Sequence, residues 1–291
     1  MKTRAVLAAA ILAVLAAAPA GAFNFGSIGD VLDKAQSAVR VGQAAGKAAQ
    51  DITPEQEYYL GRAVAATILG KYRPYDNPTV NRYLTMIGQG LAAGAGVPAT
   101  FGGYHFLALD SDEVNGFAAP GGHILVTRGL LRLCQGEDDL AGVLAHEMAH
   151  VQLRHGVKSI ESSRLNNLGA VLLKEGARQA GGHVGELVGI FEGTIGDVVQ
   201  KLMVGGYSRD QEREADRTAV ETIKRTGYDT YGLMNVLAGM NQLFKTDRRG
   251  FAATHPAPAE RFHELRPLAG SAPMPPQPAR HARFGQVRGQ F

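Results

Sequence analysis

Two histidines and a glutamate in the stretch LAHEMAHVQLRHG, residues 144–156, have the spacing of a metal-dependent hydrolase site. On an α-helix, residues four apart differ by only about 40° around the axis, so His146 and His150 project side by side and are able to grip one ion. Neutral imidazole suits zinc. Glu147 lies about 100° from His146, where it reaches a metal-bound water without ligating the ion. The HExxH pattern therefore predicts one zinc ion per chain with Glu147 as general base, and the alternative is a helix with a solvated polar patch.

A zinc site of this kind needs a third ligand. His155 is the nearest candidate, but it lies about 180° around the helix from His146, and we expect it to be a packing or surface residue. The segment SRDQEREADRTAVETI carries Glu212 and Asp216, which are four apart and share a helix face. We expect Glu212 to be the third ligand and Asp216 to accept the second ring proton of a zinc-bound histidine. The alternative is an exposed helix whose acids pair with arginines in solvent, as we expect for Glu214.

Both parts of this site require helices, and the sequence supplies their start and stop signals. The acids of GEDDL at 136–140 lie at the positive end of the HExxH helix. SRDQ at 208–211 is a capping box that starts a helix ending near Arg225, before Gly227. Similar signals predict further helices: from a capping box at 53–56 to about Lys71, from DNP at 76–78 to the glycines near 94–96, over roughly 230–244, and within 254–265 after THP.

Between residues 103 and 127 the hydrophobic period changes from that of a helix to that of strands. GYHFLALD and HILVT are typical strand sequences, and NGFAAPGG between them contains a turn. We expect a small antiparallel sheet beside the HExxH helix. The order of helices, sheet and helices predicts an α+β fold, mainly helical.

The N-terminus has the features of a secretory signal peptide. Lys2 and Arg4 precede an uninterrupted apolar run at 5–18, and AGA at 20–22 is a small-residue cleavage site. We expect cleavage after Ala22 and a periplasmic location, and the alternative is a retained membrane anchor. No later stretch is apolar enough to span a bilayer, so we expect no integral span in the mature chain.

The charge and the single cysteine exclude other classes. Loss of Lys2 and Arg4 with the leader lowers the formal net charge from +3 to +1. The basic tail holds three arginines and no acid, so the body carries about −2 and offers no basic surface for nucleic acid. Cys134 has no partner for an internal disulfide, and we expect a small buried apolar residue.

Taken together, HExxH and the ExxAD motif formed by Glu212 to Asp216 resemble metallopeptidase family 48, the gluzincin group that includes the CAAX prenyl endopeptidase, HtpX and BepA. The resemblance extends over roughly 51–268 and includes NGFAAPGGHILVTRGLL and THPAPAER. The soluble, exported BepA-like branch fits best, without its TPR domain. The expected organisation is a signal peptide at 1–22, an N-terminal helical segment at 23–50, a zincin-like metallopeptidase domain at 51–268 and a disordered, basic, proline-rich tail at 269–291.

The resemblance implies endopeptidase activity on polypeptides, with outer-membrane proteins or their assembly machinery as partners. It also implies that segment 115–126 is an edge strand at the cleft, where a substrate adds as a further strand. The substrate-binding residues would be Asn115, Gly116, Phe117 and Ala118, with Gly116 where relatives often have alanine.

Two more residues are carried over from the family motif. His255, in THP, stabilises the oxyanion or acts as a fourth ligand that closes the site, and the alternative is a surface histidine that caps a helix. Arg261 braces this segment or pairs with a carboxylate such as Asp216.

Two other functions are compatible with these residues. One is a periplasmic chaperone-like binding protein with a self-inhibited zinc site. The other is a zinc-stabilised structural protein, which requires a fourth protein ligand and no open position on the metal.

Overall fold

The structure is a computed structural model that describes residues 52–159, 161, 199–243, 254–255, 257–270 and 272–291. All of these belong to one compact unit, Ala48–Phe291. The signal peptide, the N-terminal segment at 23–50 and most of the region 157–206 lie outside the described residues, so the predictions for them are not tested. Within the described residues, none of the helices combines the length and apolar content that a membrane span requires.

The first two helices of the described residues begin and end where their capping residues predict. Helix α3 (Pro54–Leu69) starts after Thr53, whose hydroxyl accepts a hydrogen bond from the Gln56 backbone N–H, while the Gln56 side chain accepts one from the Thr53 N–H. This is the expected capping box. Helix α4 (Pro78–Ala95) starts after Asn77 and ends at Gly96, whose φ of 62° lies in the left-handed region that glycine tolerates.

The sheet has three strands: β1 (His105–Leu109), β2 (Gly116–Ala119) and β3 (His123–Thr127), in the order β1-β3-β2. β2 and β3 form an antiparallel hairpin around the short 3-10 turn η1 (Pro120–Gly122), as predicted. β1 and β3 are parallel, with His105 opposite His123, so the expectation of a purely antiparallel sheet is wrong for this pair. The chain reverses twice between β1 and β3, and these two strands therefore run the same way once β3 lies beside β1.

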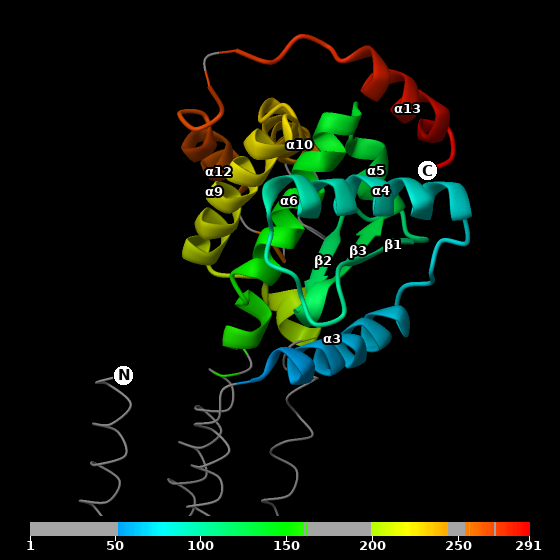
Figure 1. The fold of residues 1–291 in the computed structure, drawn as a ribbon, viewed down its shortest axis with the longest axis vertical. Coiled ribbons are helices and arrows are strands. Elements are labelled where there is room, and N and C mark those ends of the chain that lie inside the picture. Colours follow the sequence, from blue (N-terminus) through cyan, green and yellow to red (C-terminus); the bar gives the residue numbers. More distant parts are fainter. Residues whose placement is uncertain (1–51, 160, 162–198, 244–253, 256, 271) are drawn as a thin grey trace, which may run out of the picture. The chain divides into compact units, whose positions relative to one another are not determined.

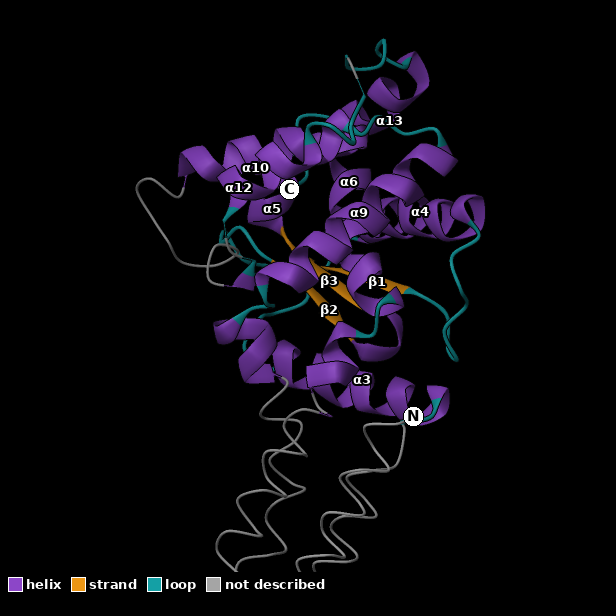
Figure 2. Ribbon diagram, turned by 90° about the vertical axis from the view of Figure 1, so that its left-hand side faces the viewer, coloured by secondary structure: helices purple, strands orange, loops and turns teal. Residues whose placement is uncertain are grey.

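Both faces of the sheet are buried, which places it between two layers of helices (Figures 1 and 2). Side chains of a strand alternate between faces. Ile124 and Val126 of β3 belong to the larger core with α4 and the HExxH helix. Leu125 belongs to a smaller core with Val64 and Ile68 of α3. The sheet is thereby a rigid support for the helix that carries the candidate site.

The HExxH helix is α6 (Glu137–Gln152), and every residue from Asp139 to Val151 is buried. It follows the short helix α5 (Arg128–Leu133), which ends at the buried Cys134. It packs against α9 (Arg209–Thr226) and α10 (Tyr231–Leu243), whose bounds match the sequence predictions. The approach of α10 is close: a Cβ at Gly142 would lie 2.7 Å from the backbone nitrogen of Leu233. Burial on all sides explains why α6 has so little amphipathic pattern.

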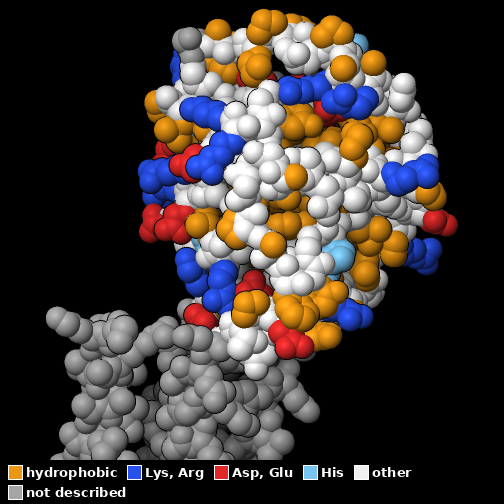
Figure 3. Space-filling view, viewed as in Figure 1, with side chains coloured by type: hydrophobic (Ala, Val, Ile, Leu, Met, Phe, Trp, Pro, Cys, Tyr) orange, Lys and Arg blue, Asp and Glu red, His pale blue; other side chains and the backbone are white. Residues whose placement is uncertain are grey.

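Three further elements, η3, α12 and the C-terminal helix α13, complete the described unit. The single π-helical turn η3 (Lys201–Gly205) contacts β2. Helix α12 (Pro258–Leu265) packs on α9 and α10. At the side formed by α9 and α12, basic and acidic groups are intermingled (Figure 3), through pairs such as Arg209 with Glu260 and Arg213 with Glu264.

The tail contains a packed helix, so the prediction of disorder is wrong for this segment. Helix α13 (Pro278–Arg288) lies against α4 and α6 (Figure 1). Phe284 and Val287, three residues apart, are buried in the larger core. Arg283 pairs with Glu137 at 2.5 Å, at the first turn of α6. The prediction of disorder rested on composition alone. The apolar side chains of Phe284 and Val287 and the pairing of Arg283 with Glu137 hold this short helix against the core.

Candidate metal centre

Four buried side chains converge on one point: His146 and His150 from α6, Glu212 from α9, and His255 from the segment before α12. One ligand atom of each lies within 4.8 Å of those of the others. The Nε2 atoms of the two α6 imidazoles lie 3.1 Å apart, with the rings nearly perpendicular. Each Nε2 lies 3.5 Å from an oxygen of Glu212. The structure thus brings together the three residues that the sequence proposes as ligands, from two helices that are distant in sequence.

The spacing and chemistry of these donors fit a small divalent cation. Ligands about 2.0–2.1 Å from a tetrahedral zinc ion lie about 3.3 Å from one another. The distances above match this value, as do those from His255 Nδ1 to His146 Nε2, 3.4 Å, and to Glu212 Oε1, 3.0 Å. Imidazole nitrogens with one carboxylate form a donor set that zinc prefers and that magnesium and calcium do not.

The charges of the centre also favour a divalent cation. Burial acts to raise the pKa of Glu212, but His255 and Arg261 outweigh it and hold that pKa well below its usual value. Burial likewise acts on Asp216, and Arg261 lowers its pKa to about 2. Three buried carboxylates, those of Glu147, Glu212 and Asp216, lie beside one buried guanidinium, that of Arg261. Burial acts to lower the pKa of His146, but hydrogen bonds to Asp216 and Glu212 outweigh it and raise that pKa to about 9, so these carboxylates favour a positive charge that a metal ion would supply in place of the proton. An excess of buried carboxylates is costly unless cations balance it.

The histidine nitrogens that face away from the centre are held by other residues. His146 Nδ1 lies 2.9 Å from Asp216 Oδ1, in the position expected for an acceptor of its ring proton. Arg261 donates to both oxygens of Asp216, at 2.8 and 2.7 Å, and its Nη1 lies 2.9 Å from Glu212. The sequence left two roles open for Arg261, and the structure shows one of them, the ion pair with Asp216. Burial holds the pKa of His150 well below its usual value, which favours the neutral imidazole that a metal requires.

Glu147 is buried beside this cluster, and neither of its carboxylate oxygens has a hydrogen-bond partner among the described residues. Its Oε1 lies 3.7 Å from His255 Nε2. Buried carboxylates are normally satisfied, so an unpaired one indicates a missing partner such as water or substrate.

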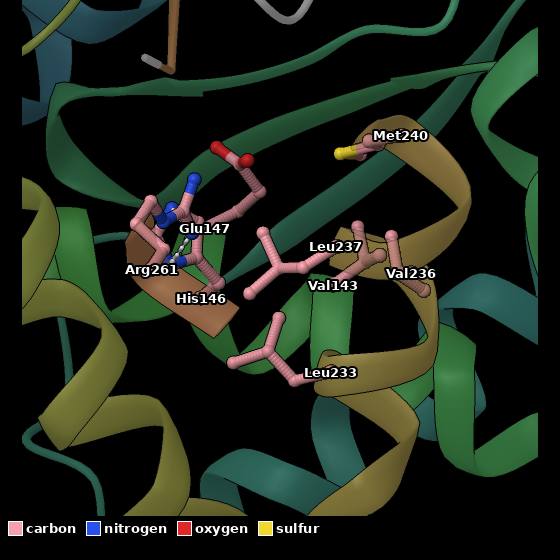
Figure 4. Close-up of a pocket in the computed structure, with 8 residues that line it drawn as sticks. All are labelled: Val143, His146, Glu147, Leu233, Val236, Leu237, Met240 and Arg261. Atoms are coloured by element: carbon pink, nitrogen blue, oxygen red, sulfur yellow. Dashed lines mark hydrogen bonds between the residues drawn. The ribbon is translucent and has the colours of Figure 1, made fainter. Parts of the chain in front are cut away.

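A small pocket lies next to Glu147, with a volume of about 10 Å³, enough for about one water molecule. Figure 4 shows polar groups on one side, with the Glu147 carboxylate beside Arg261, and apolar side chains on the other. The apolar side chains come from α6 and α10: Val143, Leu233, Val236, Leu237 and Met240. The Glu147 carboxylate therefore borders a small, mainly apolar pocket.

The predicted substrate-binding segment lies against Glu147, but it is not one strand. Within 115–126, only β2 is at the sheet edge, and β3 is the central strand. An edge location for the whole segment is therefore wrong, because the hairpin folds its second half inward. A Cβ at Gly116 would lie 2.9 Å from Glu147 Oε1, and Asn115 accepts a hydrogen bond from the Thr254 hydroxyl at 3.2 Å. Phe117 and Ala118 follow in β2 and are buried.

Sequence reasoning missed the surroundings of His150. His155 is fully buried, and its Nδ1 lies 2.8 Å from His150 Nδ1. The Tyr207 ring stacks on His150 with centroids 4.1 Å apart. The angle expected for His155 assumed a continuous helix, but α6 ends at Gln152 and Arg154 has a φ of 55°. This left-handed residue turns the chain back toward the centre.

The sequence is similar to those of known peptidases. The sequence profile of Peptidase family M48 matches residues 78–269. The chain is 27% identical over 243 residues to the beta-barrel assembly-enhancing protease of Escherichia coli O157:H7, which covers 80% of this chain and 47% of that protein. It is 30% identical over 154 residues to metalloprotease LoiP of Escherichia coli K12, covering 53% and 58% respectively. It is 29% identical over 155 residues to mitochondrial metalloendopeptidase OMA1 of Schizosaccharomyces pombe, covering 52% and 42%. The chain spans about half the length of the curated relatives it matches.

Proposed function

The chain belongs to peptidase family M48, and from this premise we propose that it is a zinc-dependent endopeptidase. One observation carries the proposal: the donors of His146, His150 and Glu212 surround one point, next to the Glu147 carboxylate, which has no hydrogen-bond partner among the described residues. In this proposal the first three residues hold one zinc ion, and Glu147 is the general base. Asp216 and Arg261 orient the ligands without binding the ion.

The chemistry is hydrolysis of a peptide bond. When bound, zinc supplies a Lewis acid that polarises the scissile carbonyl and lowers the pKa of a water molecule toward neutrality. Glu147 accepts a proton from the attacking water as its oxygen bonds to the carbonyl carbon. The C–N bond then breaks, and Glu147 returns that proton to the leaving amine. His255 Nε2, on the Glu147 side of the centre, is placed to donate a hydrogen bond to the developing oxyanion.

The substrate class follows from the surroundings of Glu147. We propose that an extended peptide adds to β2, with residues Asn115 to Ala118 supplying backbone hydrogen bonds. Such pairing reads main chain and not sequence, which suits unfolded segments. Misfolded or incompletely assembled proteins expose such segments.

The cellular role rests on the relatives and on the N-terminal sequence. One relative is named for enhancing beta-barrel assembly and is a protease. We propose that this chain is exported to the periplasm and cleaves envelope proteins there, with outer-membrane proteins or their assembly machinery as partners. Nucleic acid is not part of this role.

His255 supports a second candidate function, a chaperone-like binding protein with a self-inhibited site. Its Nδ1 lies among the donors, 3.4 Å from His146 Nε2, so His255 is able to act as a fourth ligand. A fourth protein ligand closes the position that hydrolysis needs. We propose His255→Ala as the variant that separates the roles. Faster cleavage with zinc retained identifies a gate, slower cleavage identifies oxyanion stabilisation, and no cleavage by either protein, with zinc bound, supports a binding or structural protein.

The decisive experiment compares the parent with Glu147→Gln on an unfolded casein-type substrate, with metal analysis of both proteins. Loss of a general base lowers the rate by about 10²–10⁴-fold. The variant should keep its zinc, because Glu147 is not a proposed ligand. Glu221→Gln on the exposed face of α9 is the matched control and should cleave like the parent. A Glu147→Gln protein that cuts as fast as the control refutes the assignment.

A further inference from the structure

We infer that Glu214 and His155 form a relay that fixes the tautomer of His150, so that a carboxylate at the surface positions a buried metal ligand. The relay consists of Glu214, His155 and His150, in that order. This inference rests on the proposed metal site and adds two positioning residues to it.

Two short contacts connect the three side chains. His150 Nδ1 lies 2.8 Å from His155 Nδ1. The other ring nitrogen of His155, Nε2, lies 3.2 Å from Glu214 Oε2. The His155 side chain is fully buried, whereas 54% of the Glu214 side chain is exposed. The relay therefore runs from solvent, through one buried imidazole, to a ligand of the centre.

The position of the proton on each ring follows from the fact that Nε2 is the His150 nitrogen that faces the centre. Its Nε2 lies 3.1 Å from His146 Nε2 and 3.5 Å from Glu212 Oε1. A ligating nitrogen must be unprotonated, so neutral His150 carries its proton on Nδ1. That N–H donates to His155 Nδ1, which must then be the acceptor. The proton of His155 is accordingly on Nε2.

Glu214 is the group that makes this arrangement self-consistent. A carboxylate only accepts hydrogen bonds, so it selects the His155 tautomer that carries a proton on Nε2. This leaves the Nδ1 lone pair directed at His150, and the Nε2 lone pair of His150 directed at the centre. The opposite tautomer of His155 would place two N–H groups face to face at 2.8 Å.

The two ligand histidines are thus oriented by different means. His146 contacts the carboxylate of Asp216 directly, at 2.9 Å. His150 reaches a carboxylate only through a second imidazole. The ring of Tyr207 stacks on His150 with an interplanar angle of 15°, so it restrains the plane of the ring while the relay sets its protonation. Outer partners of this kind typically change metal affinity by about 10–100-fold when mutated.

The first test reads the tautomers without any mutation. In zinc-loaded protein with ¹⁵N-labelled histidine, the ring ¹⁵N shifts and N–H couplings should place the proton on Nδ1 of His150 and on Nε2 of His155. A proton on Nδ1 of His155 overturns the inference, whatever the activity of the protein.

The second test measures zinc affinity by competition with a chromophoric chelator. Glu214→Lys replaces an acceptor by a donor and should weaken zinc binding by about 10–100-fold. Glu214→Gln keeps an acceptor oxygen and should bind zinc nearly as the parent does. Glu221→Lys makes the same charge change on an exposed position of α9 and is the control. Equal affinities for the two lysine variants overturn the inference.

His155 provides an independent comparison. His155→Leu removes the acceptor and should weaken zinc binding, and His155→Gln should recover part of the loss because its amide oxygen can accept from His150. Should the leucine variant not fold, the glutamine variant and the tautomer measurement still decide. If the parent protein binds no zinc, the proposed function is refuted. If the parent and the His155→Leu variant bind zinc with equal affinity, only the relay is refuted.

Discussion

Replacing Arg261 with methionine should destabilise the protein far more than the same replacement at a surface arginine. Arg261 is only 3% exposed and makes three charge-assisted contacts, two with Asp216 and one with Glu212, all between 2.7 and 2.9 Å. Methionine fills similar volume but leaves both carboxylates buried without this cation. Breaking a buried ion pair by removing one partner costs about 3–5 kcal/mol.

This free energy corresponds to a large shift in unfolding temperature. For a domain of this size, a loss of 1 kcal/mol lowers the midpoint by about 2–4 °C, so we expect a decrease of roughly 6–20 °C. The loss should be greater after chelation, because the buried carboxylates then have neither this guanidinium nor an ion to offset them. Arg261→Lys keeps the charge but not the planar fork, and it should lie between the parent and the methionine variant.

The assay is denaturant unfolding followed by far-UV circular dichroism, with zinc and with chelator. Arg213→Met is the matched control, because Arg213 also makes several ion pairs on α9 but is 34% exposed. Exposed pairs contribute little, so this variant should unfold close to the parent. If Arg213→Met and Arg261→Met lose the same free energy of unfolding, Arg261 does not stabilise the protein by balancing the buried carboxylates.

Three further predictions concern the ion, pH and the tail. Removal of the metal by chelation should lower the unfolding midpoint, because the buried carboxylates lose the cation that offsets them, and zinc but not magnesium should restore it; an unchanged midpoint contradicts the charge argument. Burial holds the pKa of His123 below its usual value of 6.5, so the unfolded chain binds a proton at a higher pH than the folded chain, and stability is lost as the pH falls below 6.5. His123→Gln should therefore lose less unfolding free energy than the parent between pH 7 and pH 5. Equal losses would show that His123 does not contribute. Phe284 is 3% exposed, so Phe284→Ala should cost about 3 kcal/mol in urea unfolding, whereas a disordered tail predicts no change.

Local rules were sufficient for several features of this protein. The capping boxes at Thr53 and Ser208 correctly predicted where α3 and α9 begin, because each involves residues three positions apart. The same locality placed His146 and His150 on one face of a helix. The rules failed for the sheet and the tail: β1 and β3 are parallel because β3 lies between β1 and β2 in the sheet, and α13 packs against α4 and α6.

The sequence by itself determined the residue types of the metal centre and their pairing within each helix, since a period of 3.6 residues fixes which neighbours share a face. Only the tertiary structure decided that Glu212 lies 3.5 Å from the α6 histidines, that His255 joins them, and that Arg261 balances Asp216. It also decided the contact of His155 with His150, which follows the left-handed turn at Arg154. These contacts depend on how buried helices pack against one another. Packing between segments distant in sequence produces no local hydrophobic periodicity from which it could be predicted.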